Sequence, residues 1–108
     1  MRADPDMAVY LAFMYDRLPE AEPMTLYGVY AYSAAQMMVT VLRQCGNDLS
    51  RENIMRQATN LHDIQLPLLL PGVKVNTTAT DFAPIKSAFM ARFEGEAWVP
   101  FGNLVEAK

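Results

Sequence analysis

Apolar side chains in the first half of the sequence recur at the three- and four-residue spacing that is typical of amphipathic helices. This spacing predicts a first helix over residues 5–18, which begins at Pro5 with Asp4 as its N-cap. It predicts a second helix over residues 27–45, in which Arg43 is the only charged residue. A helix with so little charge must be covered by other parts of a protein on several sides.

A third helix is predicted over residues 51–61, with Ser50 before it as an N-cap. Gly46 lies between the second and third helices, where a left-handed C-cap is expected. Prolines and a glycine between residues 67 and 72 then interrupt the helical spacing. We therefore expect no long helix in the second half of the chain.

The second half of the sequence shows the alternation of apolar and polar side chains that is typical of strands. It predicts a strand over residues 73–76, followed by a hairpin of strands at 85–93 and 97–101 with a tight turn at 94–96. Pro100 has no N–H to donate, so the last strand is expected to lie at an edge or to end there.

Three apolar helices and a hairpin cannot cover one another completely. A two-stranded hairpin is itself only marginally stable without a layer that covers it. We therefore expect a partner chain, or the remainder of a longer protein, to bury the apolar surface that these elements leave open.

The composition of the 108 residues is that of a globular domain, with 52% hydrophobic and 19% charged residues. The formal net charge is only −3. Nucleic acids and anionic membranes bind concentrated Lys and Arg, so no nucleic acid partner is expected.

The sequence carries no apolar run near the roughly 20 residues that span a bilayer. Residues 1–6 also lack the apolar core of a secretory signal peptide. Taken alone, the sequence predicts a chain that is not exported. If these residues belong to a longer protein, the same features say nothing about that protein.

The residues able to carry out chemistry are few. One cysteine, Cys45, and one histidine, His62, make a metal site improbable, and no cofactor is expected. His62 and Asp63 are adjacent and rarely face each other, so we expect them to solvate a helix end. The acidic pairs are expected in solvated loops; they are Glu20 with Glu22 and Glu94 with Glu96. We therefore expect a protein that is not an enzyme.

Several motifs follow one another in a specific order. Residues 28–42 form the long apolar helix, and residues 46–54 read Gly-Asn-Asp-Leu-Ser-Arg-Glu-Asn-Ile. Residues 71–75 read Pro-Gly-Val-Lys-Val, and residues 80–84 read Thr-Asp-Phe-Ala-Pro before a hairpin that contains Trp98. In order and spacing this resembles the C-terminal portion of periplasmic solute-binding proteins of the leucine/isoleucine/valine type, which serve ABC transporters.

The resemblance implies an α/β fold, namely the C-terminal segment of a type I periplasmic-binding fold with two lobes that close on a ligand. It implies a periplasmic protein that captures an amino acid or a related small molecule and delivers it to an ABC transporter permease. The family's main contacts to the ligand come from residues well upstream of this segment. We therefore expect these 108 residues alone not to bind ligand.

Two tyrosines at the start of the second helix are the candidate ligand-binding residues. The resemblance places an aromatic or polar side chain near this helix start, at the edge of the ligand cleft, and Tyr27 matches that position. Tyr30 follows one helical turn later. Either could close over an apolar part of a ligand and hydrogen-bond through its hydroxyl. The alternative is that Tyr27, Tyr30 and Tyr32 are packing residues.

A second hypothesis comes from a different class of function. The excess of apolar helix surface also fits a free-standing interaction module that homo-oligomerises to bury its helices. The two hypotheses can hold together, because a segment separated from its lobes would also cover its apolar surface by self-association. A homo-oligomer is thus the expected state of the isolated chain.

Overall fold

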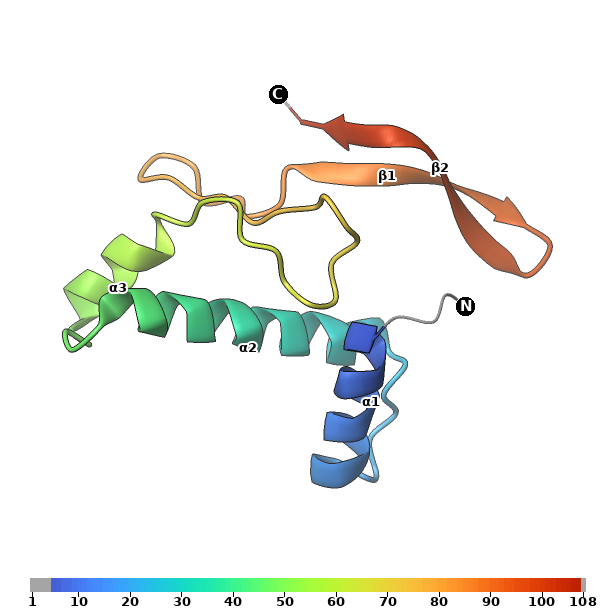
Figure 1. Cartoon of the computed structure of the whole chain (residues 1–108), viewed down its shortest axis with the longest axis horizontal. Helices are drawn as coiled ribbons and strands as arrows, with labels where there is room; N and C mark the ends of the chain where they lie inside the picture. Colours follow the sequence, from blue (N-terminus) through green and yellow to red (C-terminus); the bar gives the residue numbers. More distant parts are fainter. Residues whose placement is uncertain (1–4, 108) are drawn as a thin grey trace.

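The computed structural model describes residues 5–107, and the predicted N-cap Asp4 lies outside the described residues. Within that range the fold is mixed α/β, with three helices followed by a two-stranded antiparallel sheet (Figure 1). The molecule is flat, with principal extents of 49 × 39 × 19 Å. This confirms the coarse fold class that the sequence predicts.

Helix α1 (Pro5–Arg17) lies at the N-terminal end of α2 (Leu26–Cys45) and runs in a different direction from it (Figure 1). The junction is formed by Tyr10, which is fully buried. Its hydroxyl donates to the carbonyl of Pro23 at 2.6 Å, and its ring meets Tyr32 edge-on at 5.1 Å. Phe13 lies 5.5 Å from the same Tyr32 ring. An aromatic cluster therefore holds the first helix against the second.

The N-terminal end of α2 is capped by Thr25, whose Oγ1 accepts a hydrogen bond from the N–H of Gly28 at 3.1 Å. Gly28 is also where the Tyr10 hydroxyl approaches the helix. A Cβ atom at this position would lie 2.8 Å from that hydroxyl oxygen. Tyr10 and Gly28 thus depend on each other, because any larger residue would force the ring away.

Helix α2 ends at Gly46, whose φ of +61° is positive as expected for a glycine cap, but its ψ of −126° differs from that of the predicted left-handed C-cap. Helix α3 (Arg51–Ala58) then begins with Ser50 as its N-cap, and its Oγ accepts from the N–H of Asn53 at 3.2 Å. The Nδ2 of the buried Asn53 donates to the carbonyl of Asp48 at 2.8 Å and to that of Cys45 at 3.4 Å. Asn53 therefore ties the start of α3 to the end of α2.

Asp48 completes this turn. Its Oδ1 accepts from the N–H of Ser50 at 3.1 Å. Hydrogen bonds from the Ser50 hydroxyl and backbone N–H, with a smaller effect of the Arg56 charge, hold the pKa of the Asp48 carboxyl below its usual range. The conspicuous residues of the 46–54 motif thus have structural roles in the α2–α3 turn.

The third helix is shorter than predicted, because it ends at Ala58 and not at residue 61. Thr77, distant in sequence, accounts for this difference. Its Oγ1 donates to the carbonyl of Ala58 at 2.7 Å and accepts from the N–H of Leu61 at 3.0 Å. The helix can therefore end here, because Thr77 provides hydrogen bonds for the carbonyl of Ala58 and the N–H of Leu61.

The predicted strand at 73–76 is wrong, because the structure has only isolated bridges there. Val75 pairs with Ile64 on one side and with Ile85 on the other. The bridge to Ile64 is closed by reciprocal hydrogen bonds of 2.8 and 3.1 Å. Pro84 accepts from the N–H of Asn76 but has no N–H to return, so the bridge at Ile85 does not extend into a ladder. The alternation reflected the inward orientation of Val73 and Val75, both of which are buried.

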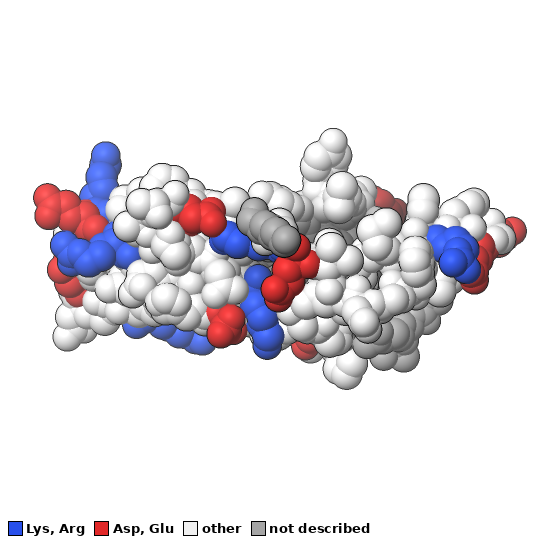
Figure 2. Space-filling model, turned by 90° about the horizontal axis from the view of Figure 1, so that it is seen from above, with Lys and Arg blue, Asp and Glu red and all other residues white. Residues whose placement is uncertain are grey.

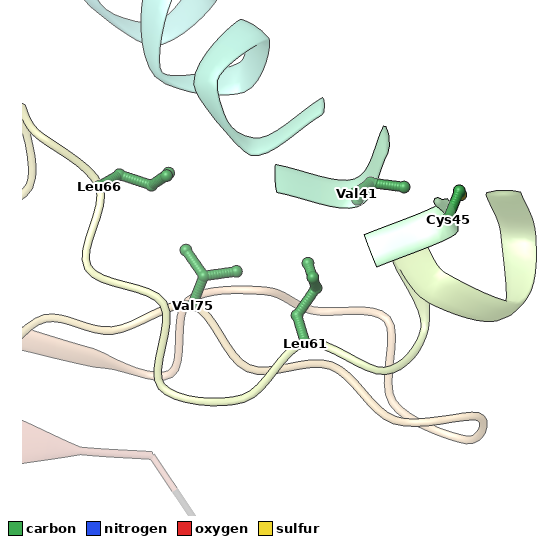
Figure 3. Close-up of a cluster of buried hydrophobic side chains, with 5 residues drawn as sticks. All are labelled: Val41, Cys45, Leu61, Leu66 and Val75. Atoms are coloured by element: carbon green, nitrogen blue, oxygen red, sulfur yellow. The ribbon is translucent and has the colours of Figure 1, made fainter. Parts of the chain in front are cut away.

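The main hydrophobic core lies where residues 59–86 cross the C-terminal half of α2 (Figure 3). Its buried side chains are Val41, Cys45, Leu61, Leu66 and Val75. Cys45 is therefore a core residue with a free thiol. The core joins a regular helix to a segment that has almost no regular structure.

Strands β1 (Ser87–Glu94) and β2 (Ala97–Glu106) form the C-terminal hairpin, connected by a loop whose Gly95 has φ +65°. The last strand is longer than predicted. It passes Pro100, which pairs with Ala91, and continues to Glu106 after an irregularity between the Ala88 and Met90 pairings. Pro100 is tolerated because every strand of a two-stranded sheet is an edge strand.

The hairpin extends away from the helices and is mostly solvent-exposed (Figure 1). Its exposed apolar side chains are Met90, Phe93, Trp98, Val99, Phe101 and Val105. The face of the molecule in Figure 2 is largely uncharged, and its acidic and basic side chains are interspersed. Much apolar surface is thus left uncovered, as the sequence predicts.

We predict that Gly28→Ala lowers the free energy of unfolding by about 1–2 kcal/mol, because the new methyl group clashes with the Tyr10 hydroxyl. In a Tyr10→Phe background the hydroxyl is gone, and the same substitution becomes neutral or stabilising, since alanine favours helix by about 1 kcal/mol over glycine. Urea unfolding of the four variants in a double-mutant cycle measures this coupling. A stabilising effect of Gly28→Ala in the wild-type background would contradict it.

Candidate functional site

An apolar groove runs along α2, between this helix and the crossing segment 59–86. It consists of two adjoining pockets of about 230 and 320 Å³, which share Ala34, Met37 and Pro84 in their walls. We call it the α2 groove. Its α2 side is lined by Leu26, Val29, Tyr30, Ser33, Ala34, Met37, Met38 and Val41, and its other walls include Leu61, Leu66, Leu68, Leu69, Val75, Phe82 and Ile85.

The polar groups in the α2 groove are few. The pocket nearer the start of α2 has the side-chain hydroxyls of Tyr30 and Ser33, and the other pocket has those of Thr59 and Thr77. The hydroxyls of Thr59 and Thr77 already bond to backbone groups. Tyr30 and Ser33 are therefore the side chains best placed to orient a bound polar atom. The remaining lining can only accept an apolar surface.

The structure separates the three tyrosines at the start of α2. Tyr30, with 73% of its surface exposed, lines the groove, whereas Tyr27, with 86% exposed, lines neither pocket. Tyr32 packs against Tyr10 and Phe13. The packing alternative thus holds for Tyr32. The ligand-binding roles predicted for Tyr27 and Tyr30 stay predictions, and Tyr30 has the better position.

A separate, polar pocket of about 250 Å³ lies where the crossing segment meets the hairpin, and no pattern in the sequence predicts it. Its charged walls are Asp63, Lys74, Lys86 and Glu106. The Lys86 ammonium donates to the carbonyl of Asn76 at 2.7 Å and to that of Ala83, so it anchors the chain. The residues that line this pocket connect the crossing segment to the start of the hairpin.

The other chemically active residues do not converge. The Nε2 of His62 lies 2.9 Å from Oδ1 of Asn60, while the N–H of Asp63 donates to Asn76 at 3.0 Å. His62 lies beyond the end of α3, so the prediction that it solvates a helix end is wrong. Among residues 5–107, no three side chains of the metal-binding types come together.

The residues of the 80–84 motif also have structural roles. Asp81 and Thr78 form a bridge, and Oδ1 of Asp81 accepts from the N–H of Ala83 at 3.1 Å. Its other carboxylate oxygen lies 3.4 Å from the Lys86 ammonium. This turn fixes the direction in which the chain enters β1.

Comparisons with known proteins give no relative. No protein-family model matches the chain, no curated protein is similar to it, and no solved structure matches its fold.

Across the described helices, none is long and apolar enough to cross a membrane.

We predict that the α2 groove binds the apolar dye 1-anilinonaphthalene-8-sulfonate and that Tyr30→Asp lowers the dye fluorescence at least about threefold, because a carboxylate in the wall repels the anionic dye. The matched control is Tyr27→Asp, which makes the same change one turn earlier and outside the groove. Equal effects of the two substitutions would mean that the dye binds elsewhere.

Proposed function

We propose that these residues are part of an extracytoplasmic solute-binding protein that captures a small molecule, an amino acid or a related compound, for an ABC importer. The observation that carries the proposal is the order of the sequence motifs at 28–42, 46–54, 71–75 and 80–84, followed by the hairpin. Each motif alone is short and common. Their succession at the expected spacing over most of the chain is far more specific.

The physical character of the surface supports this proposal. A segment from the interior of a larger two-lobed protein would leave apolar faces open when it stands alone. The α2 groove is one such face, and the exposed hairpin is another. In the proposed protein, residues from the rest of the lobe would cover the apolar walls of the groove and leave the exposed Tyr30 to reach the ligand.

The motif residues themselves are compatible with a structural role in such a protein. Asn53 fixes the α2–α3 turn and Asp81 fixes the entry to β1, while Thr77, which lies between two of the motifs, holds the crossing segment. None of them is free to bind a ligand, because their polar atoms are engaged within the chain. This agrees with a family in which ligand contacts lie mainly upstream.

The proposed mechanism is hinge closure, in which binding energy comes from burying a small molecule between two lobes. No bond in the ligand is made or broken. A transporter permease would then recognise the closed form. Tyr27 and Tyr30 are the residues of this chain proposed to reach the ligand, and both are exposed enough to contact an opposing lobe.

The proposal is tested on the longest polypeptide encoded by the reading frame that contains these residues. We expect calorimetric titration with amino acids, amides and aromatic acids to show one ligand bound per polypeptide, whereas the 108 residues alone bind none. A reading frame limited to these residues, or a longer polypeptide that binds no member of the pool, would contradict the proposal. Ligand binding by the 108 residues alone would show that the account of the upstream contacts is wrong.

The alternative is a free-standing interaction module that homo-oligomerises to bury its helices. The observation that favours it is the run of exposed apolar side chains on the helices themselves. These include Val9, Phe13, Leu26, Tyr30, Met38, Val39 and Leu42. An apolar surface of this kind marks a site of protein association.

For this alternative we predict that the chain is a dimer or larger by light scattering, unchanged by amino acids. Met38→Glu should then lower the mass toward the monomer, because a buried carboxylate at the interface is costly. The control is Asn47→Asp, which adds the same charge in the exposed α2–α3 turn. A mass that does not respond to Met38→Glu would rule out association through the α2 face.

A further inference from the structure

Methionine side chains gather in one of the two pockets of the α2 groove. The sequence has eight methionines, and three of them, Met37, Met38 and Met55, line the pocket of about 320 Å³. Met37 and Met38 belong to α2 and Met55 belongs to α3, so two helices supply these side chains. Methionine is flexible and polarisable, which suits it to surfaces that adapt to apolar partners. Its thioether can also be oxidised to a sulfoxide, which is polar.

Two of these three methionines are open to solvent. Met38 is 49% exposed and Met55 is 57% exposed, whereas Met37 is partly buried and packs against the main core. An oxidant can therefore reach Met38 and Met55 in the folded chain. Neither of them belongs to the main core. Their oxidation would thus change the wall of the pocket and leave the packing of the core intact.

The hydroxyls in this pocket have no hydrogen left to donate to a sulfoxide. They belong to Thr59 and Thr77. The hydroxyl of Thr59 donates to the carbonyl of Met55 at 2.9 Å, and that of Thr77 donates to the carbonyl of Ala58 at 2.7 Å. A hydroxyl has a single hydrogen, and these bonds use it. An oxygen added to Met38 or Met55 would therefore bond to water and not to these hydroxyls.

An apolar occupant of the pocket would have to remove that water. The neighbouring walls include Val41, Leu61 and Phe82, whose side chains offer no hydrogen bond in exchange. Taking a polar oxygen out of water without replacing its hydrogen bonds is unfavourable. The oxidised pocket would therefore disfavour the same apolar surfaces that the reduced pocket accepts.

We propose that Met38 and Met55 form a reversible oxidation site that closes the α2 groove to apolar surfaces. With hydrogen peroxide as the oxidant, the O–O bond breaks and an S–O bond forms at each thioether. The sulfur loses two electrons, and the second peroxide oxygen leaves as water. Methionine sulfoxide reductases reverse the change with a dithiol, which becomes a disulfide while the sulfoxide oxygen leaves as water. The inference concerns the groove while it is open and does not depend on the proposed function.

The first test measures 1-anilinonaphthalene-8-sulfonate fluorescence of the chain before and after treatment with hydrogen peroxide. The wild-type signal should fall at least about threefold, because sulfoxides in the pocket wall disfavour the dye. Met38→Leu with Met55→Leu removes both sulfurs at nearly constant volume, so its signal should stay within about 1.5-fold. The control is Met24→Leu with Met90→Leu, which removes two thioethers of matching exposure, 49% and 56%, outside the groove. It should respond as the wild type does.

Each outcome of this test has a definite meaning. All the variants keep the buried Cys45, so its chemistry is common to them. Circular dichroism before and after oxidation checks that the helices persist, and methionine sulfoxide reductases with dithiothreitol should restore the wild-type signal. The proposal would be overturned by an untreated chain that binds no dye, by a wild-type signal that survives oxidation or is not restored, or by equal losses in the two double variants.

The second test imitates the sulfoxide without an oxidant. Glutamine is close to methionine in length and carries a polar carbonyl near its end. Met38→Gln with Met55→Gln should lower the dye fluorescence at least about threefold in untreated protein, because the added polar groups face the pocket. Met24→Gln with Met90→Gln makes the same change outside the groove and should leave the signal within about 1.5-fold. Equal signals from the two glutamine variants would contradict a role for the position of Met38 and Met55.

Discussion

The side-chain hydroxyl of Thr77 is the contact on which the arrangement of the second half depends. By bonding to Ala58 and Leu61 together, it ends α3 and brings the crossing segment onto α2. Leu61 and Val75 then reach Val41, and the main core forms. A segment with almost no ladder of its own is anchored to the helices by Thr77 and by the buried side chains of Leu61, Leu66 and Val75. The anchored segment forms the far wall of the α2 groove.

Two separate clusters hold α2, one near each end. The aromatic junction of Tyr10 and Tyr32 secures its start, and the core around Val41 and Cys45 secures its end. Between them the helix is covered on one side only. A thickness of 19 Å corresponds to about two layers of secondary structure. The groove lies between these two anchored ends, where the crossing segment runs beside α2 without filling the space between them.

Local patterns in the sequence predicted most elements, and contacts between distant residues explain the errors. The start and end of α2 follow from Thr25 and Gly46, which act on their own neighbours. The early end of α3 could not be predicted, because it depends on Thr77, nineteen residues from its partner Ala58. Val75 alternates as in a strand, although it forms only single bridges.

The same difference between local sequence patterns and contacts of distant residues applies to the candidate site. Aromatic residues near the start of the long helix directed attention to Tyr27 and Tyr30, but sequence spacing could not tell which of them lies in the groove. That depends on where Pro84 and Leu66 lie in the folded chain. The apolar excess of the helices was predictable from composition, because charges are few. Its concentration into one groove needed the three-dimensional arrangement.

The position of the single tryptophan has a spectroscopic consequence. Trp98 is 70% exposed near the tip of the hairpin, with its ring centre 5.2 Å from that of Phe93. Its emission therefore reports the surroundings of the hairpin, while circular dichroism near 222 nm reports mainly the helices. Loss of the helical core and covering of the hairpin produce separate optical signals in this protein. Changes in the helices and changes around the hairpin can thus be followed independently in an unlabelled sample.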